Sequence, residues 1–137
     1  SGDTHTHFLG PRSASLEAAG EDLNVINVLL SSGGNYFSNI ADFTGGPDPA
    51  SDADTIVYIT EETRHDFLGH AVLLNLKELI YPFGWGDPDT GVHGGYDYPT
   101  MAQQADAAHA QGGLVAWAHM PFPNAERGDA HQMRLAC

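Results

Sequence analysis

Apolar residues recur along this 137-residue chain in short runs, separated by segments rich in Gly, Pro and Asp. Runs of about four to eight apolar or β-branched residues bounded by turn residues are typical of buried strands. We therefore expect five strands, at residues 3–8, 23–30, 55–60, 67–76 and 114–119. The run from Leu23 to Leu30 is mostly apolar and β-branched, which is typical of a strand in a parallel sheet.

Two segments carry the signals of helices. Ser13 is predicted to cap a short helix that ends at Gly20. Asp97 and Pro99 mark the start of a second helix over residues 100–111, which a pair of glycines closes. The order strand, helix, three strands, helix, strand predicts one α/β domain over the whole chain, with a mostly parallel sheet.

Composition limits the classes of partner. Eighteen Asp and Glu residues against five Lys and Arg residues give a formal net charge of −13. Such a field repels nucleic acid and anionic membranes and attracts cations. We therefore expect no nucleic-acid and no membrane partner, and a small molecule as substrate. The sequence shows no signal-peptide pattern and no run of about 18 apolar residues, so we expect a soluble protein of unassigned localisation.

The first predicted strand carries two histidines, His5 and His7, one residue apart. Successive side chains of a strand alternate between faces, so both imidazoles should point the same way, with Asp3 on that face too. Neutral imidazole is the commonest zinc ligand and also suits iron, copper and nickel. The pair predicts a metal site, although a single histidine at a strand end is more often structural.

Three further residues fall at strand ends: Glu62 after the third strand, His70 at the start of the fourth and His119 at the end of the last. The carboxyl ends of parallel strands meet at one edge of a sheet, where ligands bind. Together with the N-terminal pair they would form a single-metal site with an open position, or a two-metal site bridged by Glu62. The predicted metal ligands are His5, His7, Glu62, His70 and His119.

Some choices remain open at this point. Glu61 is the alternative to Glu62, since one of two adjacent carboxylates normally faces solvent. Asp42 could equally bind metal or cap a turn. His93 lies in a long Gly- and Pro-rich loop at residues 81–97, where it is a candidate for contact with substrate.

These residues occur in motifs that resemble those of the PHP (polymerase and histidinol phosphatase) superfamily. Residues 2–7 resemble its opening Gly-Asp-x-His-x-His, and residues 67–70 and 115–121 resemble later motifs. The likeness is greatest to the carbaryl-hydrolase-like (CehA/McbA-type) branch and extends over residues 2–126. It implies a distorted (β/α)7 barrel with a zinc, manganese or iron centre at the strand ends. It also implies hydrolysis of phosphoester, ester, amide or carbamate bonds.

By this resemblance, His5 and His7 would bind one metal, Glu62 would bridge, and His70 and His119 would serve a second. Glu62 and His119 would be the catalytic residues, with metal-bound hydroxide as the attacking group. The alternative is a non-catalytic metal- or ligand-binding barrel that keeps part of the site. The superfamily's Thr-Asp-His is replaced after the second strand, at residues 29–34, which supports this alternative.

The closing Asp-x-His of the superfamily does not occur before Cys137. A complete barrel needs on the order of 200 to 250 residues. We therefore expect a partial barrel that lacks its last strands. Its exposed sheet edge would allow a homodimer to form.

Overall fold

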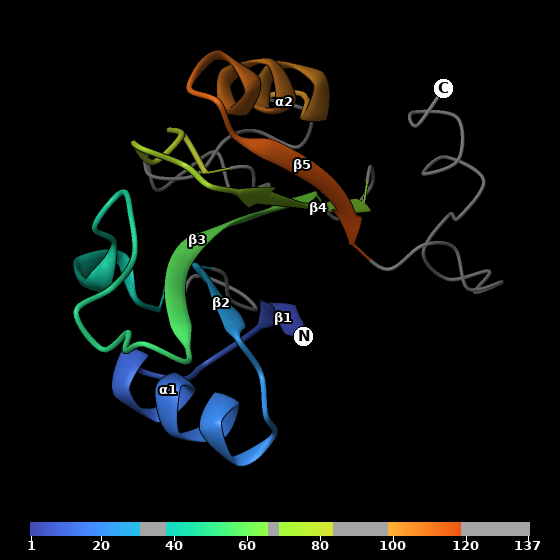
Figure 1. The fold of residues 1–137 in the computed structure, drawn as a ribbon. Helices are drawn as coiled ribbons and strands as arrows, with labels where there is room; N and C mark the ends of the chain where they lie inside the picture. Colours follow the sequence, from blue (N-terminus) through green and yellow to red (C-terminus); the bar gives the residue numbers. More distant parts are fainter. Residues whose placement is uncertain (31–37, 66–68, 84–98, 119–137) are drawn as a thin grey trace, which may run out of the picture.

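The computed structural model describes residues 1–30, 38–65, 69–83 and 99–118. Its elements are β1 (Gly2–Thr6), α1 (Pro11–Gly20), β2 (Val25–Leu30), the 3-10 turn η1 (Ile40–Asp42), β3 (Ile56–His65), β4 (Gly69–Leu74), α2 (Met101–Ala110) and β5 (Leu114–Ala118) (Figure 1). The strands form one sheet in the order β1-β2-β3-β4-β5. In these ranges, no helix has the length and apolar character needed to cross a membrane.

The sheet is mixed. The β1–β2 and β2–β3 pairs are parallel, whereas β3–β4 and β4–β5 are antiparallel, so β4 runs against the other four strands. The predicted mostly parallel (β/α)7 barrel is therefore wrong: the sheet curls into an open half-barrel, and the described ranges contain two helices (Figure 1). The physical reason lies between His65 and Gly69, where the connection is too short for the crossover of a dozen or more residues that a parallel pair requires.

The bend of the sheet is centred on β3. Residues 56–61 of β3 pair with β2, and residues 61–65 pair with β4. Glu61 is the one residue in these two registers that has a partner on both sides, Leu30 and Leu73. The two neighbours of β3 therefore lie against different halves of one long strand, which is visibly bent (Figure 1). The strand predicted at residues 55–60 thus continues past both glutamates.

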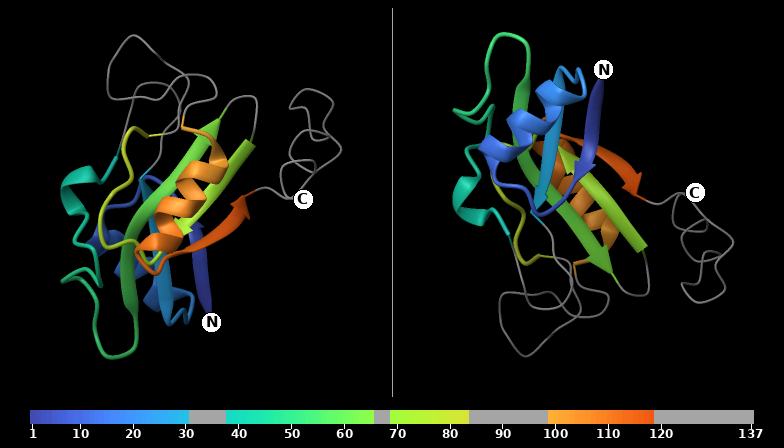
Figure 2. Two further views of the ribbon diagram at one scale, coloured as in Figure 1. Left: turned by 90° about the horizontal axis from the view of Figure 1, so that it is seen from above. Right: turned by 90° about the horizontal axis from the view of Figure 1, so that it is seen from below.

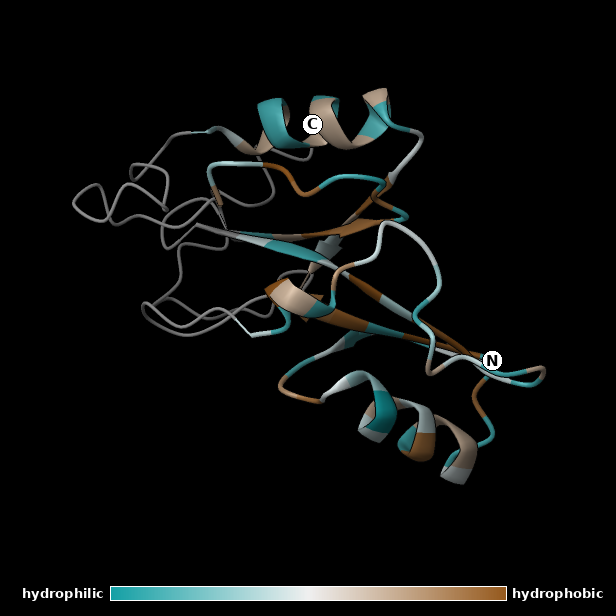
Figure 3. Ribbon diagram, turned by 90° about the vertical axis from the view of Figure 1, so that its left-hand side faces the viewer, coloured by the Kyte–Doolittle hydropathy of each residue, from teal (hydrophilic) through white to brown (hydrophobic). Residues whose placement is uncertain are grey.

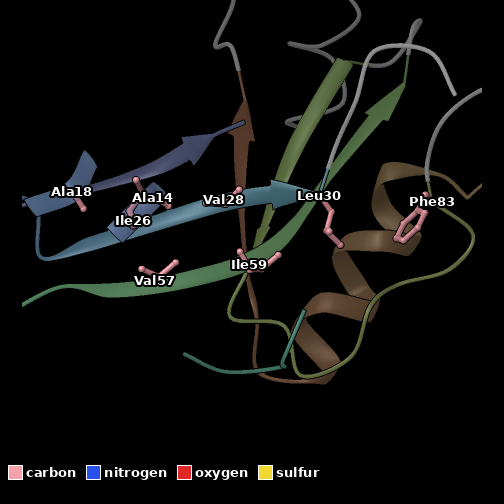
Figure 4. Close-up of a cluster of buried hydrophobic side chains, with 8 residues drawn as sticks. All are labelled: Ala14, Ala18, Ile26, Val28, Leu30, Val57, Ile59 and Phe83. Carbon is pink, nitrogen blue, oxygen red and sulfur yellow. The ribbon is translucent and has the colours of Figure 1, made fainter. Parts of the chain in front are cut away.

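Both helices cover the same face of the sheet. Ala14 and Ala18 of α1 belong to a buried cluster with strand residues that include Ile59 (Figure 4). Ala108 of α2 packs in a second cluster with Leu73. Because Leu73 is the partner of Glu61, two residues after Ile59 on β3, the two clusters lie on one side of the sheet. Two views of the ribbon show α1 beside the β1–β3 half and α2 beside the β4–β5 half (Figure 2).

The opposite face of the sheet, hereafter the concave face, has its own small core. Leu29, Val72 and Ala118 form a buried cluster there, one residue from each of β2, β4 and β5. Hydrophobic and hydrophilic stretches both occur along the strands and along the helices (Figure 3). Polar residues lie beside this cluster, since Val72 pairs with Glu62 and Ala118 pairs with His70.

The helix starts differ from those predicted. Gly10 is the N-cap of α1 and Pro11 is its first residue, where a missing N–H costs nothing. Ser13 lies inside the first turn. Thr100 caps α2 in a capping box with Gln103, in which each side chain bonds to the other residue's backbone N–H.

Candidate metal centre

An irregularity in β1 decides where its histidines point. Asp3 pairs with Ile26 and Thr6 with Val28, so three residue steps on β1 match two on β2. This extra residue is a β-bulge, and it places Asp3 and Thr6 on the same face. Both line a cavity on the α1 side. The prediction that Asp3 shares a face with the histidines is therefore wrong, because strict alternation fails at the bulge.

His5 and His7 lie on the concave face, where they meet Glu62 of β3. His5 Nε2 lies 3.6 Å from Glu62 Oε1, and His7 Nε2 lies 3.3 Å from Glu62 Oε2. The two imidazole rings are edge to face, with centroids 4.9 Å apart. The side chain of Glu62 is 1% exposed, against 27% for His5 and 23% for His7. A buried carboxylate therefore faces two imidazoles that solvent can reach.

These three residues could hold a metal ion. One ligand atom from each of His5, His7 and Glu62 lies within 4.8 Å of the other two. Ligand atoms around a tetrahedral zinc ion, at bond lengths of about 2.0–2.1 Å, are about 3.4 Å apart. The separations of 3.3 and 3.6 Å between the imidazole nitrogens and the carboxylate oxygens fit that spacing. Two histidines and one glutamate also form a known catalytic zinc set that leaves a coordination position open.

His70 approaches the same carboxylate from the other side. Its Nδ1 lies 3.1 Å from Glu62 Oε1, and its side chain is 11% exposed. The residue is near the start of β4 and pairs with Arg64, two residues after Glu62. Because β4 is reversed, its beginning lies at the edge of the sheet where β3 ends. His70 contacts Glu62 but does not belong to the group of three whose ligand atoms are mutually close.

Glu61 points away from this centre. It is fully buried on the helix-covered face, where its Oε2 accepts a hydrogen bond of 3.1 Å from the backbone N–H of Ile80. Burial raises the pKa of the Glu61 carboxyl to about 8, although the Ile80 hydrogen bond opposes this shift. Of the two adjacent glutamates, Glu62 is thus the one that faces the histidines.

The remaining predicted residues are not placed at the centre. Asp42 Oδ2 accepts a hydrogen bond of 3.1 Å from the Asn39 amide, which also donates to the Leu9 carbonyl at 2.9 Å. Asp42 therefore helps to fix the turn after β1 and is not part of the three-residue group. His119 and His93 lie outside the described residues.

Two polar residues of the concave face were not singled out from the sequence. Asn27 and Thr60 are 3% and 1% exposed. Thr60 Oγ1 donates to Asn27 Oδ1 at 2.9 Å, and Asn27 Nδ2 donates to the Thr4 carbonyl at 3.3 Å. A polar residue inside the apolar run 23–30 was the available signal, since buried amides normally have a hydrogen-bond partner.

Comparisons with protein-family models, with curated proteins and with solved structures find no match to the chain.

Proposed function

We propose that the chain is a metal-dependent hydrolase with a site of the PHP superfamily kind. His5, His7 and Glu62 would hold one divalent transition metal, zinc, manganese or iron. His70 would serve a second ion, together with His119, at the carboxylate that it shares with the first. The observation that carries the proposal is the convergence of three histidines on the two oxygens of one buried carboxylate: His5 of β1, His7 just after β1, and His70 of β4.

Glu62 has the environment of a functional carboxylate. Burying an ionised carboxylate is costly unless charge partners or a cation compensate for the lost hydration. Three imidazoles face Glu62 in the described ranges, and each is cationic only when protonated. A divalent cation would neutralise Glu62 at any pH at which the histidines are neutral. The donor set thus favours a cation at this position.

A bound divalent metal would supply Lewis acidity, and would lower the pKa of a coordinated water towards neutrality. The chain's own residues provide access and orientation. His5 and His7 are each about a quarter exposed, so substrate would approach across these two rings. A proton on His70 Nδ1 would face Glu62 Oε1 and orient the carboxylate.

The expected substrate bond is a phosphoester, ester, amide or carbamate. The net charge of −13 disfavours the approach of anionic molecules. Uncharged esters, amides and carbamates are therefore better suited to this site than phosphate monoesters.

The alternative function is non-catalytic metal or ligand binding. One observation favours it. At the end of β2, the residue on the concave face is the apolar Leu29, so the described part of this strand provides no ligating side chain there. Such a site would bind its ion through β1 and β3 and carry out no reaction.

Metal analysis and a substrate panel test the proposal. Protein purified without a His tag should contain about one or more equivalents of transition metal. The double variant His5→Ala/His7→Ala should lose this metal. His109→Ala is the matched control, because His109 is exposed on α2 and should leave the metal content unchanged.

The metal-loaded protein is then assayed against phosphoester, ester, amide and carbamate substrates with added Mn²⁺ or Zn²⁺. Turnover that disappears in the double variant and persists in His109→Ala supports the hydrolase. Bound metal without turnover supports the binding alternative. Less than about a tenth of an equivalent of metal, with unchanged stability of the double variant, contradicts the hydrolase and metal binding alike.

A further inference from the structure

The backbone at the β1 bulge is satisfied by side chains. The backbone N–H of His5 donates to Asp3 Oδ1 at 2.9 Å. The carbonyl of Thr4 accepts from Asn27 Nδ2 at 3.3 Å. A bulge leaves its extra residue outside the regular ladder, so these groups need other partners. Asp3 and Asn27 provide them.

Asn27 also connects the bulge to the strand that carries Glu62. Its Oδ1 accepts a hydrogen bond of 2.9 Å from Thr60 Oγ1, and Thr60 precedes Glu62 by two residues on the same face of β3. A chain of two hydrogen bonds, the second of them buried, therefore runs from the Thr4 carbonyl through Asn27 to Thr60. It links the strand of the two histidines to the strand of the carboxylate.

We propose that Asn27 is a positioning residue: through the Thr4 carbonyl and the Thr60 hydroxyl it fixes the β1 bulge that turns His5 and His7 towards Glu62. Without the bulge, strict alternation would place Asp3 on the same face as the two histidines. It would also shift the histidines along the strand direction relative to Glu62. This inference rests on the proposed function for its metal readout. Its structural part, the orientation of two imidazoles, stands without a metal.

The geometry explains why an amide is needed at residue 27. The Thr4 carbonyl requires a donor, and the Thr60 hydroxyl, when it donates, requires an acceptor. A carboxamide offers both at once and brings no charge to a position that is 3% exposed. A leucine of similar size would leave the Thr60 hydroxyl buried without this acceptor and would remove the side-chain donor to the Thr4 carbonyl.

The test measures Co²⁺ and Zn²⁺ affinity by chelator competition, together with the visible spectrum of the Co²⁺-loaded protein. Asn27→Leu should weaken metal affinity by at least about tenfold and alter the Co²⁺ spectrum, as expected when the support of a ligand is lost. Val28→Ala is the matched control. Val28 is the buried neighbour on the α1 face, so its truncation should lower stability and leave affinity within about twofold.

A second pair of variants avoids the risk that Asn27→Leu fails to fold. Thr60→Val keeps the shape of the side chain and removes the hydroxyl, whereas Thr60→Ser keeps the hydroxyl. Only Thr60→Val should weaken metal affinity, by about three- to tenfold. Equal affinities for the two variants, or wild-type affinity in folded Asn27→Leu, overturn the positioning role.

The metal-free protein separates this inference from the proposed function. Ring-to-ring nuclear Overhauser contacts between His5 and His7 should be present in the wild type and in Val28→Ala, and lost in Asn27→Leu. If the wild type binds no metal but this pattern holds, the proposed function fails and the positioning role stands. If the contacts persist in Asn27→Leu, the positioning role fails whatever the metal result.

Discussion

Glu61 and Glu62 are adjacent on β3 and face opposite sides of the sheet. Glu62 lies within 3.6 Å of imidazole nitrogens from three histidines on the concave face. Glu61 is buried on the helix-covered face and accepts a hydrogen bond from the backbone N–H of Ile80. The same side-chain chemistry is thus placed in two environments by the alternation of a single strand. This arrangement provides matched variants at neighbouring positions.

Substitution of each glutamate by glutamine should distinguish a residue that binds the metal from one that lies elsewhere in the fold. Glu62→Gln removes the negative charge of the three-residue group and should reduce metal affinity by at least about a hundredfold, because divalent ions bind carboxylates far better than amides. Glu61→Gln should leave affinity within about threefold, since its side chain lies on the other face. Chelator competition measures both. Equal losses would show that Glu62 has no special role.

Glu61 should make the metal-free protein less stable as pH rises. Its pKa is raised to about 8 in the folded protein, above its ordinary value of 4.5. Between these values the folded state retains a proton that the unfolded state has released, so stability falls with pH, by up to about tenfold in the folding constant per pH unit. Below the ordinary value, both states are protonated and the effect vanishes.

Denaturant unfolding of wild type and Glu61→Gln in the presence of a chelator measures this effect. The variant keeps an oxygen for the Ile80 amide but cannot ionise. The two proteins should therefore be similar in stability near pH 4.5, and the variant should be the more stable near pH 8. Parallel stability curves over that interval would contradict a raised pKa for Glu61.

Substitution of His70 should affect the metal centre less than substitution of the β1 histidines. His70 contacts Glu62 but lies outside the group of three mutually close ligand atoms. His70→Ala should retain one equivalent of metal, with affinity reduced by about ten- to a hundredfold, and should lose any second equivalent. Metal stoichiometry and competition titration measure this. Complete loss of the first ion would instead make His70 one of its direct ligands.

Gly45 should tolerate no side chain. Its φ is +71°, and a Cβ atom there would lie 2.5 Å from the Lys77 carbonyl oxygen. Gly45→Ala should lower the free energy of unfolding by more than about 2 kcal/mol, from the left-handed backbone and the clash together. At Gly46, an added Cβ meets nothing within 4 Å, so Gly46→Ala should change stability by less than about 1 kcal/mol. Denaturant unfolding of the pair measures the difference.

Local patterns in the sequence predict the strands and helices well, because burial and capping depend on nearby residues. The common orientation of His5 and His7 follows from their spacing, and both contact Glu62. The position of Asp3 could not be predicted in this way, since the bulge depends on the amide of Asn27 from another strand.

The direction of β4 also cannot be predicted from the local sequence pattern. An apolar run at residues 67–76 reads the same whether the strand is parallel or antiparallel. Strand direction is set by the short connection after His65. The sequence pattern ends the third strand at residue 60, so it does not indicate how short this connection is. The reversal nevertheless brings the start of β4 to the end of β3, which is how His70 reaches Glu62.

The bulged strand has a consequence for the cooperativity of the protein. In the described part of the sheet, β1 pairs with β2 alone, and its partner carboxylate lies more than fifty residues away along the chain. Outer strands are the first segments to open in local unfolding. Fraying of five residues would therefore abolish cation affinity while the rest of the domain stays folded. Conversely, an ion captured between β1 and β3 would slow amide hydrogen exchange at the N-terminus far more than in α2.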